Sequence, residues 1–311
     1  MTPFFGYHMP SFSFPDATDE TRFERLVTLA CAAEEAGFDL VTVMDHFYQI
    51  GVHGSEEEPM LEAYATLSAL AARTSRVKLG TMVSGVTYRN PALLAKTVTT
   101  LDTISNGRAV LGLGAAWNDV EHAGYGFDFP PIGERMSRLD EALQICKLMF
   151  TEERPSFEGR YYRIQQALNV PRPIQPGGPP ILIGGSGEKR TLRFVARYGD
   201  MSNWWGSMDD LTHHSEVLDR HCEAEGRDPS TILRTIMAPV ILVADQGQAE
   251  ATLSHLSPER RAQVTAATPA EAAEALQPYL EAGFGGFIFR NTSMMTTEAI
   301  GLAGELMRLM R

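Results

Sequence analysis

Residues 101–130, LDTISNGRAVLGLGAAWNDVEHAGYGFDFP, decide the fold class of this chain. They contain the end of a helix, an Asn106-Gly107 break, an apolar run over residues 109–113 and a loop punctuated by glycines. Asn and Gly both tolerate the left-handed backbone that a helix exit needs. The compact apolar run predicts a buried strand. The rest of the chain can be read as repeats of this unit.

The repeats alternate strands with helices over short connections. The predicted strands cover residues 4–9, 40–44, 77–83, 109–113, 181–183, 201–205, 233–243 and 286–289. The predicted helices cover residues 21–36, 61–73, 91–105, 135–150, 188–198, 209–225, 269–282 and 297–310. A Pro-rich stretch, 151–180, with a hairpin turned at Glu158-Gly159, and an irregular helical stretch, 247–268, interrupt the pattern. Eight such units predict an α/β fold, a (β/α)8 barrel closed within one domain, residues 1–311.

Composition restricts the partners of this chain. Its 311 residues are 44% hydrophobic and 21% charged, with a net charge of −12. That charge argues against a nucleic-acid or anionic-membrane surface, since both need clustered Lys and Arg. The three cysteines are far apart, and no apolar leader or membrane-spanning stretch is visible, so we expect a cytoplasmic protein. A small molecule is the expected partner.

In a closed barrel, active-site residues lie just after the strands, at the carboxyl face. The repeat therefore selects candidate residues by position, before their chemistry is considered. These residues are His8, Asp45, His46, Met82, Val83, Ser84, Ala115, Ala116, Trp117, Asn118, Gly184, Gly185, Ser186, Gly187, Trp204, Trp205, Arg290 and Asn291. They include two histidines, an acid, tryptophans, an arginine and a Gly-rich turn. The turn at residues 114–118 carries small side chains, which would suit either a flat ligand or tight packing alone.

Four motifs resemble the luciferase-like monooxygenase superfamily. They are VMDHF at residues 43–47, LGTMVSGVTYRNPALLAK at 79–96, LDTISNGRAVLGLGAAWN at 101–118 and GERMSRLDEAL at 133–143. The pattern is most similar to the branch that uses the deazaflavin coenzyme F420. The resemblance spans nearly the whole chain. It implies a (β/α)8 barrel with insertions before the fifth strand and after the seventh, and a homodimer.

The resemblance also implies roles for residues at the strand ends. Asp45 would contact the cofactor, and His46 would lie beside the reacting carbon as the catalytic proton-transfer residue, although a structural histidine is the alternative. Residues 82–84 would form a bulge with a cis peptide, at Met82-Val83, against the flavin ring. Gly114, Ala115 and Asn118 would complete the cofactor-binding surface.

The Gly184-Gly185-Ser186-Gly187 turn precedes a helix that carries Lys189, Arg190 and Arg193. Backbone N–H groups, a hydroxyl and nearby cations would suit the cofactor phosphate, although such a turn can also be structural. No metal site is predicted, because His213, His214 and His221 lack an acid or cysteine that completes a metal-binding pattern.

Aromatic and cationic side chains at the barrel mouth are the substrate candidates: His8, Trp117, Tyr125, Trp205 and Arg290. The resemblance implies a glutamate at the position of Ala115, and a tryptophan in the loop 48–59, for relatives that oxidise sugar phosphates. This chain has neither. Sugar-phosphate oxidation is therefore in doubt, and the substrate and direction stay open.

Three functions fit these observations. The first is an F420-dependent oxidoreductase that moves hydride to or from a small organic substrate. The second is an FMN-dependent monooxygenase supplied with reduced flavin by a partner reductase. The third is a non-catalytic relative of these enzymes. Selective binding of F420, of FMN or of neither would separate them.

Overall fold

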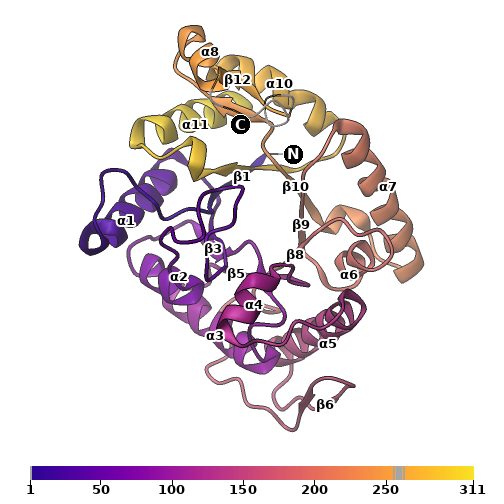
Figure 1. Cartoon of the computed structure of the whole chain (residues 1–311). Helices are drawn as coiled ribbons and strands as arrows, with labels where there is room; N and C mark the ends of the chain where they lie inside the picture. The colour runs from indigo at the N-terminus through magenta and orange to yellow at the C-terminus, as the bar shows by residue number, and fades with distance from the viewer. Residues whose placement is uncertain (1, 255, 257–260, 262) are drawn as a thin grey trace.

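The computed structural model describes residues 2–254, 256, 261 and 263–311. A ring of parallel strands forms its centre (Figure 1). The barrel strands are β1 (Phe4–Met9), β2 (Leu40–Val43), β3 (Lys78–Thr81), β5 (Ala109–Gly114), β8 (Ile181–Gly184), β9 (Met201–Trp204), β10 (Leu233–Met237) and β13 (Gly286–Arg290). Their order is β3-β2-β1-β13-β10-β9-β8-β5, and pairing of β3 with β5 closes the ring. The predicted eight-stranded barrel is confirmed.

Helices surround the ring and cover its outer face (Figure 1). The helices between successive barrel strands, and after the last, are α1 (Asp19–Ala36), α2 (Ala63–Ala71), α3 (Pro91–Ser105), α5 (Ile132–Thr151), α6 (Thr191–Tyr198), α7 (Met208–Glu225), α10 (Pro269–Glu281) and α11 (Thr297–Met310). Asn90 caps α3 by accepting from the N–H groups of the first turn, as Asn-Pro predicts. Among the described residues, no helix is both long and apolar enough to cross a bilayer.

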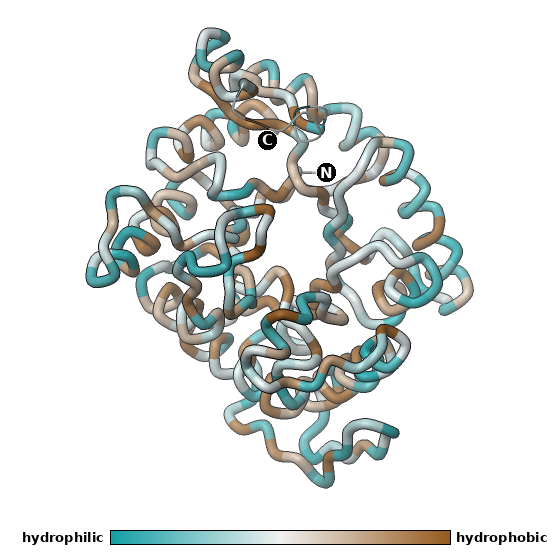
Figure 2. Tube along the Cα trace, viewed as in Figure 1, coloured by the Kyte–Doolittle hydropathy of each residue, from teal (hydrophilic) through white to brown (hydrophobic). Residues whose placement is uncertain are grey.

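Alternation along each strand sends side chains to two separate cores. Phe5, Tyr7 and Phe287 point outward and pack beneath the helices in the larger core. Leu40 and Leu182 belong to a smaller apolar cluster on the inner faces of the strands. Hydrophilic residues lie mainly on the outer turns of the helices (Figure 2). The barrel is therefore a filled core whose chemistry is confined to its ends.

The structure corrects the predicted strand over residues 233–243. β10 ends at Met237, and the chain continues as β11 (Val240–Leu242), which pairs with β12 (Thr265–Ala267) in a separate parallel two-stranded sheet. Pro239 stands at the break, where it has no N–H to continue the ladder. The stretch 247–268 was predicted as helical. It contains α8 (Gln246–Ser254) and then β12, and residues 255, 257–260 and 262 lie outside the described part.

Three other boundaries differ from the prediction. The third strand ends at Thr81, and β4 (Ser84–Gly85) pairs separately with β5. Residues expected to form a loop fold into the short helix α4 (Asp119–Tyr125). α6 starts three residues later than predicted, at Thr191. The predicted hairpin within 151–180 is confirmed: β6 (Phe157–Glu158) pairs antiparallel with β7 (Arg163–Ile164).

The part of the chain that the structure describes also contains two short 3-10 helices. They are η1 (Pro229–Thr231) before β10 and η2 (Asn291–Ser293) after β13.

Candidate active site

A buried glutamate on α4 fixes the backbone and the histidine that follow β2. The Glu121 carboxylate accepts from the N–H groups of Phe47 at 2.6 Å and Tyr48 at 2.9 Å. Its other oxygen accepts from His46 Nδ1 at 2.7 Å and from the Tyr88 hydroxyl at 2.8 Å. Burial raises the pKa of Glu121, but these hydrogen bonds outweigh burial and lower the pKa below its usual range. Glu121 is therefore an ionised acceptor that orients His46.

This orientation determines which atom of His46 can act on a ligand. An ionised carboxylate only accepts, so His46 carries a proton on Nδ1. In the neutral ring, Nε2 then carries the lone pair. The ring of Trp117 lies edge-on to His46, with centroids 5.4 Å apart. Nε2 is the nitrogen that remains for proton exchange with a ligand.

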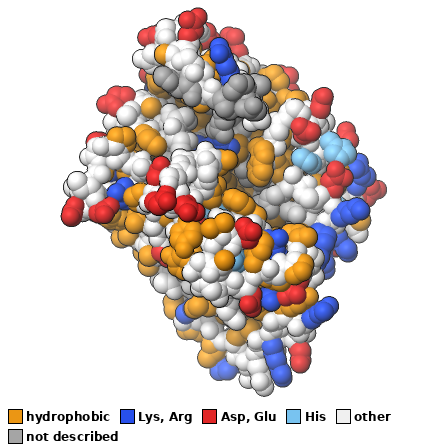
Figure 3. Space-filling view, viewed as in Figure 1, with side chains coloured by type: hydrophobic (Ala, Val, Ile, Leu, Met, Phe, Trp, Pro, Cys, Tyr) orange, Lys and Arg blue, Asp and Glu red, His pale blue; other side chains and the backbone are white. Residues whose placement is uncertain are grey.

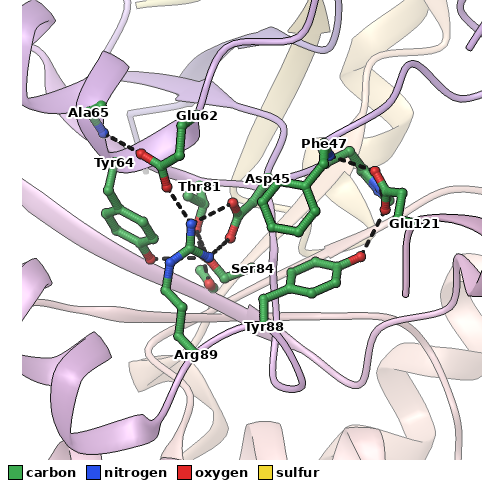
Figure 4. A network of polar contacts seen from close by, with 12 residues as sticks. Asp45, Phe47, Glu62, Tyr64, Ala65, Thr81, Ser84, Tyr88, Arg89 and Glu121 are labelled. Atoms are coloured by element: carbon green, nitrogen blue, oxygen red, sulfur yellow. Dashed lines mark hydrogen bonds and ion pairs between the residues drawn. The ribbon is translucent and has the colours of Figure 1, made fainter. Parts of the chain in front are cut away.

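Arg89, from the loop before α3, holds Asp45. Its guanidinium donates to both carboxylate oxygens of Asp45, at 2.5 and 3.0 Å, and to Glu62. The Tyr64 ring lies 4.8 Å from the guanidinium, and the Tyr64 hydroxyl bonds Ser84 Oγ at 3.0 Å. Figure 4 shows Arg89 between the two acids. Both oxygens of Asp45 are thus engaged by protein, so any contact with a cofactor has to share them.

The bulge after β3 has the cis peptide predicted at Met82-Val83. The Val83 side chain lies against two neighbouring strand ends: a Cβ built on Gly114 would approach Val83 Cγ2 to 2.9 Å, and one built on Gly184 would approach it to 2.7 Å. The two glycines are therefore required for Val83 to pack between β5 and β8. The structure joins these predicted residues to one another, beside the buried hydroxyl of Ser84.

His8 lies deeper, inside the barrel. It is 6% exposed, and its Nδ1 is hydrogen-bonded to Thr42 Oγ1 at 2.9 Å. Strand register places His8 beside Arg290 of β13. Burial, the charge of Arg290 and nearby His53 and His46 lower the pKa of His8 to about 3. His8 is therefore a neutral hydrogen-bonding group across the physiological range.

The turn after β8 is partly exposed to solvent. Gly185 has a φ of 102°, a left-handed conformation that favours glycine, and residues 184–186 are half-buried. The three cations predicted near this turn differ in their surroundings. Arg190 donates to α5 at 2.9 and 3.1 Å, and Arg193 pairs with Glu225 at 3.0 Å. Lys189 is exposed.

The remaining substrate candidates differ in their surroundings. Trp117 is 60% exposed and Trp205 is 66% exposed, each just beyond its strand. Tyr125 is 54% exposed and stacks on Phe47, with ring centroids 4.5 Å apart. It belongs to an aromatic group that covers the loop after β2. The structure therefore places Trp117 directly beside His46, and Tyr125 against the neighbouring Phe47 ring.

Three side chains that hold candidate site residues in place were not among the predicted residues. Glu121 and Arg89 orient His46 and Asp45. Arg135 of α5 donates to the Ala116 carbonyl at 2.6 Å and so holds the backbone beside Trp117. Each charge lies within or next to a quoted motif. The missing signal was their surroundings: Glu121 and Arg135 are buried and Arg89 is half-buried, and a charge removed from water needs a partner or a role.

Comparison with known proteins agrees with this architecture. The chain matches the luciferase-like monooxygenase family over residues 4–308. An F420-dependent glucose-6-phosphate dehydrogenase of Kineococcus radiotolerans is 33% identical over 298 residues, which cover 85% of this chain and 86% of the relative. One of Nocardia farcinica is also 33% identical, over 300 residues that cover 85% and 87%.

Solved structures show the same fold. An F420-dependent secondary alcohol dehydrogenase in complex with an F420-acetone adduct superposes with a TM-score of 0.82 at 20% identity, and the match covers all of both chains. The family match extends from β1 to α11, which includes every barrel strand. The chain belongs to the luciferase-like monooxygenase family.

Proposed function

We propose that this protein is an F420-dependent oxidoreductase, which transfers hydride between the cofactor and a small organic molecule. The observation that carries the proposal is the His46 imidazole, held by ionised Glu121 at the barrel mouth and flanked by Trp117. The relatives of about 33% identity carry F420-dependent names, which supports this choice of cofactor.

The residues at the mouth fit a deazaflavin. The ends of β5 and β8 bring together small residues, among them Gly114, Ala115 and Gly184, beside the Val83 bulge. Because the Val83 side chain packs over Gly114 and Gly184, a flat ring at this end of the barrel would lie against Val83 rather than against the two glycines. Asn118 offers an amide for the ring edge, and the backbone at Gly185 and Ser186 offers donors for a phosphate.

The chemistry divides between cofactor and protein. When bound, F420 supplies a deazaflavin that accepts or gives hydride. His46 Nε2 takes the hydroxyl proton as an alcohol becomes a carbonyl compound, and returns it in the reverse direction. Ionised Glu121 favours the protonated imidazole that results, because its carboxylate lies 2.7 Å from Nδ1. Trp117 shields this ring from one side.

Separate titrations with F420 and FMN test the proposal. We expect purified protein to bind F420 at least tenfold more tightly than FMN, followed by fluorescence of each cofactor. Reduced F420 should then form when a suitable alcohol is added. Tighter binding of FMN would instead support a flavin monooxygenase that needs a partner reductase, and binding of neither would support a non-catalytic protein.

The proposal also covers the oligomeric state of the protein and its cellular compartment. We propose that the single domain acts as a homodimer in the cytoplasm. The free thiols of Cys31, Cys146 and Cys222 suit a reducing compartment, and exposed Leu93 and Ile104 on α3 offer an apolar surface for a second copy. Light scattering on the purified protein measures the oligomeric state.

A further inference from the structure

The bulge that carries Val83 interrupts the pairing of two barrel strands. β3 pairs with β5 at residues 79–80 and 109–110, and pairing resumes where residues 84–85 of β4 meet residues 113–114. Residues 81–83 lie between these two stretches. Because a flat ring at this end of the barrel would lie against Val83, the groups that hold the bulge bear on how the cofactor is placed.

Three buried hydroxyl groups, which we call the hydroxyl chain, bridge this interval. Thr81 Oγ1 donates to the Gly112 carbonyl of β5 at 3.0 Å and lies 3.0 Å from Ser84 Oγ. Ser84 Oγ in turn lies 3.0 Å from the hydroxyl oxygen of Tyr64, which α2 carries. Thr81 and Ser84 are fully buried, and Tyr64 is 4% exposed. Figure 4 shows the Tyr64 hydroxyl pointing toward Ser84.

The direction of these hydrogen bonds follows from the single proton that each hydroxyl group carries. Because Thr81 donates to the Gly112 carbonyl, Thr81 accepts from Ser84. Because Ser84 donates to Thr81, Ser84 accepts from Tyr64. Burial and the charge of Asp45 raise the pKa of Tyr64 well above its usual range, so Tyr64 keeps its proton. Tyr64 is therefore the first donor of the hydroxyl chain.

Both ends of the hydroxyl chain are fixed. At one end, a Cβ built on Gly112 would lie 1.9 Å from the Thr81 carbonyl oxygen, so only glycine lets β5 approach this closely. At the other end, the Arg89 guanidinium lies 4.8 Å from the centre of the Tyr64 ring. Glu62 pairs with Arg89 and also caps the first turn of α2. The helix therefore presents the Tyr64 hydroxyl to the bulge from a fixed position.

We propose that Tyr64 is a positioning residue for the cofactor: its hydroxyl, acting through the hydroxyl chain, holds the bulge so that Val83 lies against the cofactor ring. This inference rests on the proposed function for the identity of that ring. On the face seen in Figure 3, hydrophobic side chains gather around the middle, which suits an apolar contact of this kind. Tyr64 is buried, so it acts through the bulge rather than on the ligand.

Amide hydrogen exchange in the protein without cofactor tests the hydroxyl chain. The quantity is the exchange rate at residues 82–86 divided by that at residues 201–204 of β9, a ratio that cancels global unfolding. Tyr64→Phe keeps the ring and removes the donor, so we expect this ratio to rise by about fivefold. Tyr7→Phe is the matched control, because it removes another buried tyrosine hydroxyl, which donates to the Met294 carbonyl at 2.8 Å. An unchanged ratio in Tyr64→Phe, or an equal rise in Tyr7→Phe, would overturn the proposal.

A double variant shows whether Tyr64 and Ser84 act through one chain. Ser84→Ala leaves the Tyr64 hydroxyl as a buried donor without its acceptor, so it should raise the exchange ratio more than Tyr64→Phe does. Adding Tyr64→Phe to Ser84→Ala removes that donor, so the ratio should rise no further. A ratio that rises by the product of the two single effects would show independent action and contradict the proposal.

Exchange with the cofactor bound tests the contact between the bulge and the ring. At ten times its Kd, F420 should slow exchange at residues 82–86 of the parent protein by about tenfold. Tyr64→Phe should also shift the absorption band of bound F420, whereas Tyr7→Phe should not.

The two proposals fail in different ways. Protein that binds F420 without slower exchange at residues 82–86 keeps the proposed function and loses this inference. Protein that binds FMN instead, with slower exchange at these residues, keeps the role of Tyr64 and loses the F420 reaction. Protein that binds neither cofactor loses both.

Discussion

The two sides of the barrel mouth are built differently. On the side of β2 and β5, buried acids and a bidentate arginine fix His46 and Asp45 through hydrogen bonds of 2.5 to 3.0 Å. On the side of β8, residues 184–186 are half-buried and Lys189 is exposed. Proton transfer needs a side chain that is already oriented before the ligand binds. A phosphate group can instead order the backbone turn that binds it. We infer that the first side determines turnover and the second determines cofactor affinity.

The largest effect is expected at His46. His46→Gln removes the proton acceptor at Nε2, so kcat should fall by about 10²- to 10⁴-fold. The Kd for F420 should change by less than about threefold, because the turn after β8 remains intact. Steady-state kinetics and cofactor titration measure the two quantities. Equal turnover in both proteins would show that His46 is structural.

Glu121 should have the next largest effect. Glu121→Gln can still accept from the N–H groups of Phe47 and Tyr48, but its amide end would favour the opposite tautomer of His46. Loss of the required tautomer should lower kcat by about 10²-fold or more. Tyr88→Phe is the matched control: it removes one hydrogen bond, costs about 1 kcal/mol of unfolding free energy and should leave kcat within a few fold. Similar kcat values in the two variants would separate Glu121 from catalysis.

Substitutions in the turn after β8 should change the affinity of the protein for F420. Ser186→Ala combined with Lys189→Ala removes a hydroxyl and a cation near the predicted phosphate position, so we expect the Kd for F420 to rise by about three- to tenfold. The loss should shrink at high salt, since exposed charges are screened. At saturating F420, kcat should stay near that of the parent protein. A large fall in kcat with unchanged Kd would reverse the roles of the two sides.

His8 should affect the pH dependence of stability. Its pKa is near 3 in the folded protein against 6.5 when unfolded, so only the unfolded chain takes up the proton as pH falls below 6.5. This one group should lower the unfolding free energy by up to about 1.4 kcal/mol per pH unit between pH 6.5 and 3. His8→Gln should remove that part of the acid slope, measured by urea unfolding at pH 7, 6 and 5. Identical slopes would mean that His8 titrates normally.

The fold could be predicted because short segments of sequence indicate buried parallel strands and the ends of the helices between them. Asn90 before Pro91 and Asn106 before Gly107 mark the ends of α3, and both are cap residues in the structure. The break at Pro239 was missed because its neighbours on both sides are apolar strand formers. The helix α4 was missed because its seven residues, DVEHAGY, span only about two turns and are too few to show a helical period.

The candidate site could be predicted only in part. Strand ends placed His46, Trp117 and Asn118 at the mouth, because the position of a strand end follows from the repeat. The role of Glu121 depends on α4 packing against a loop about 75 residues earlier, which no local pattern records. The cis bond at Met82-Val83 followed from family resemblance, and its packing against Gly114 and Gly184 appeared only in three dimensions.

The most direct test of the account is a crystal structure of the F420 complex, read at His46. We predict that Nδ1 stays within hydrogen-bond distance of Glu121 and that Nε2 faces the reacting face of the deazaflavin, with the phosphate at the turn after β8. A cofactor bound elsewhere, or a His46 ring with Nε2 turned away from it, would contradict the account.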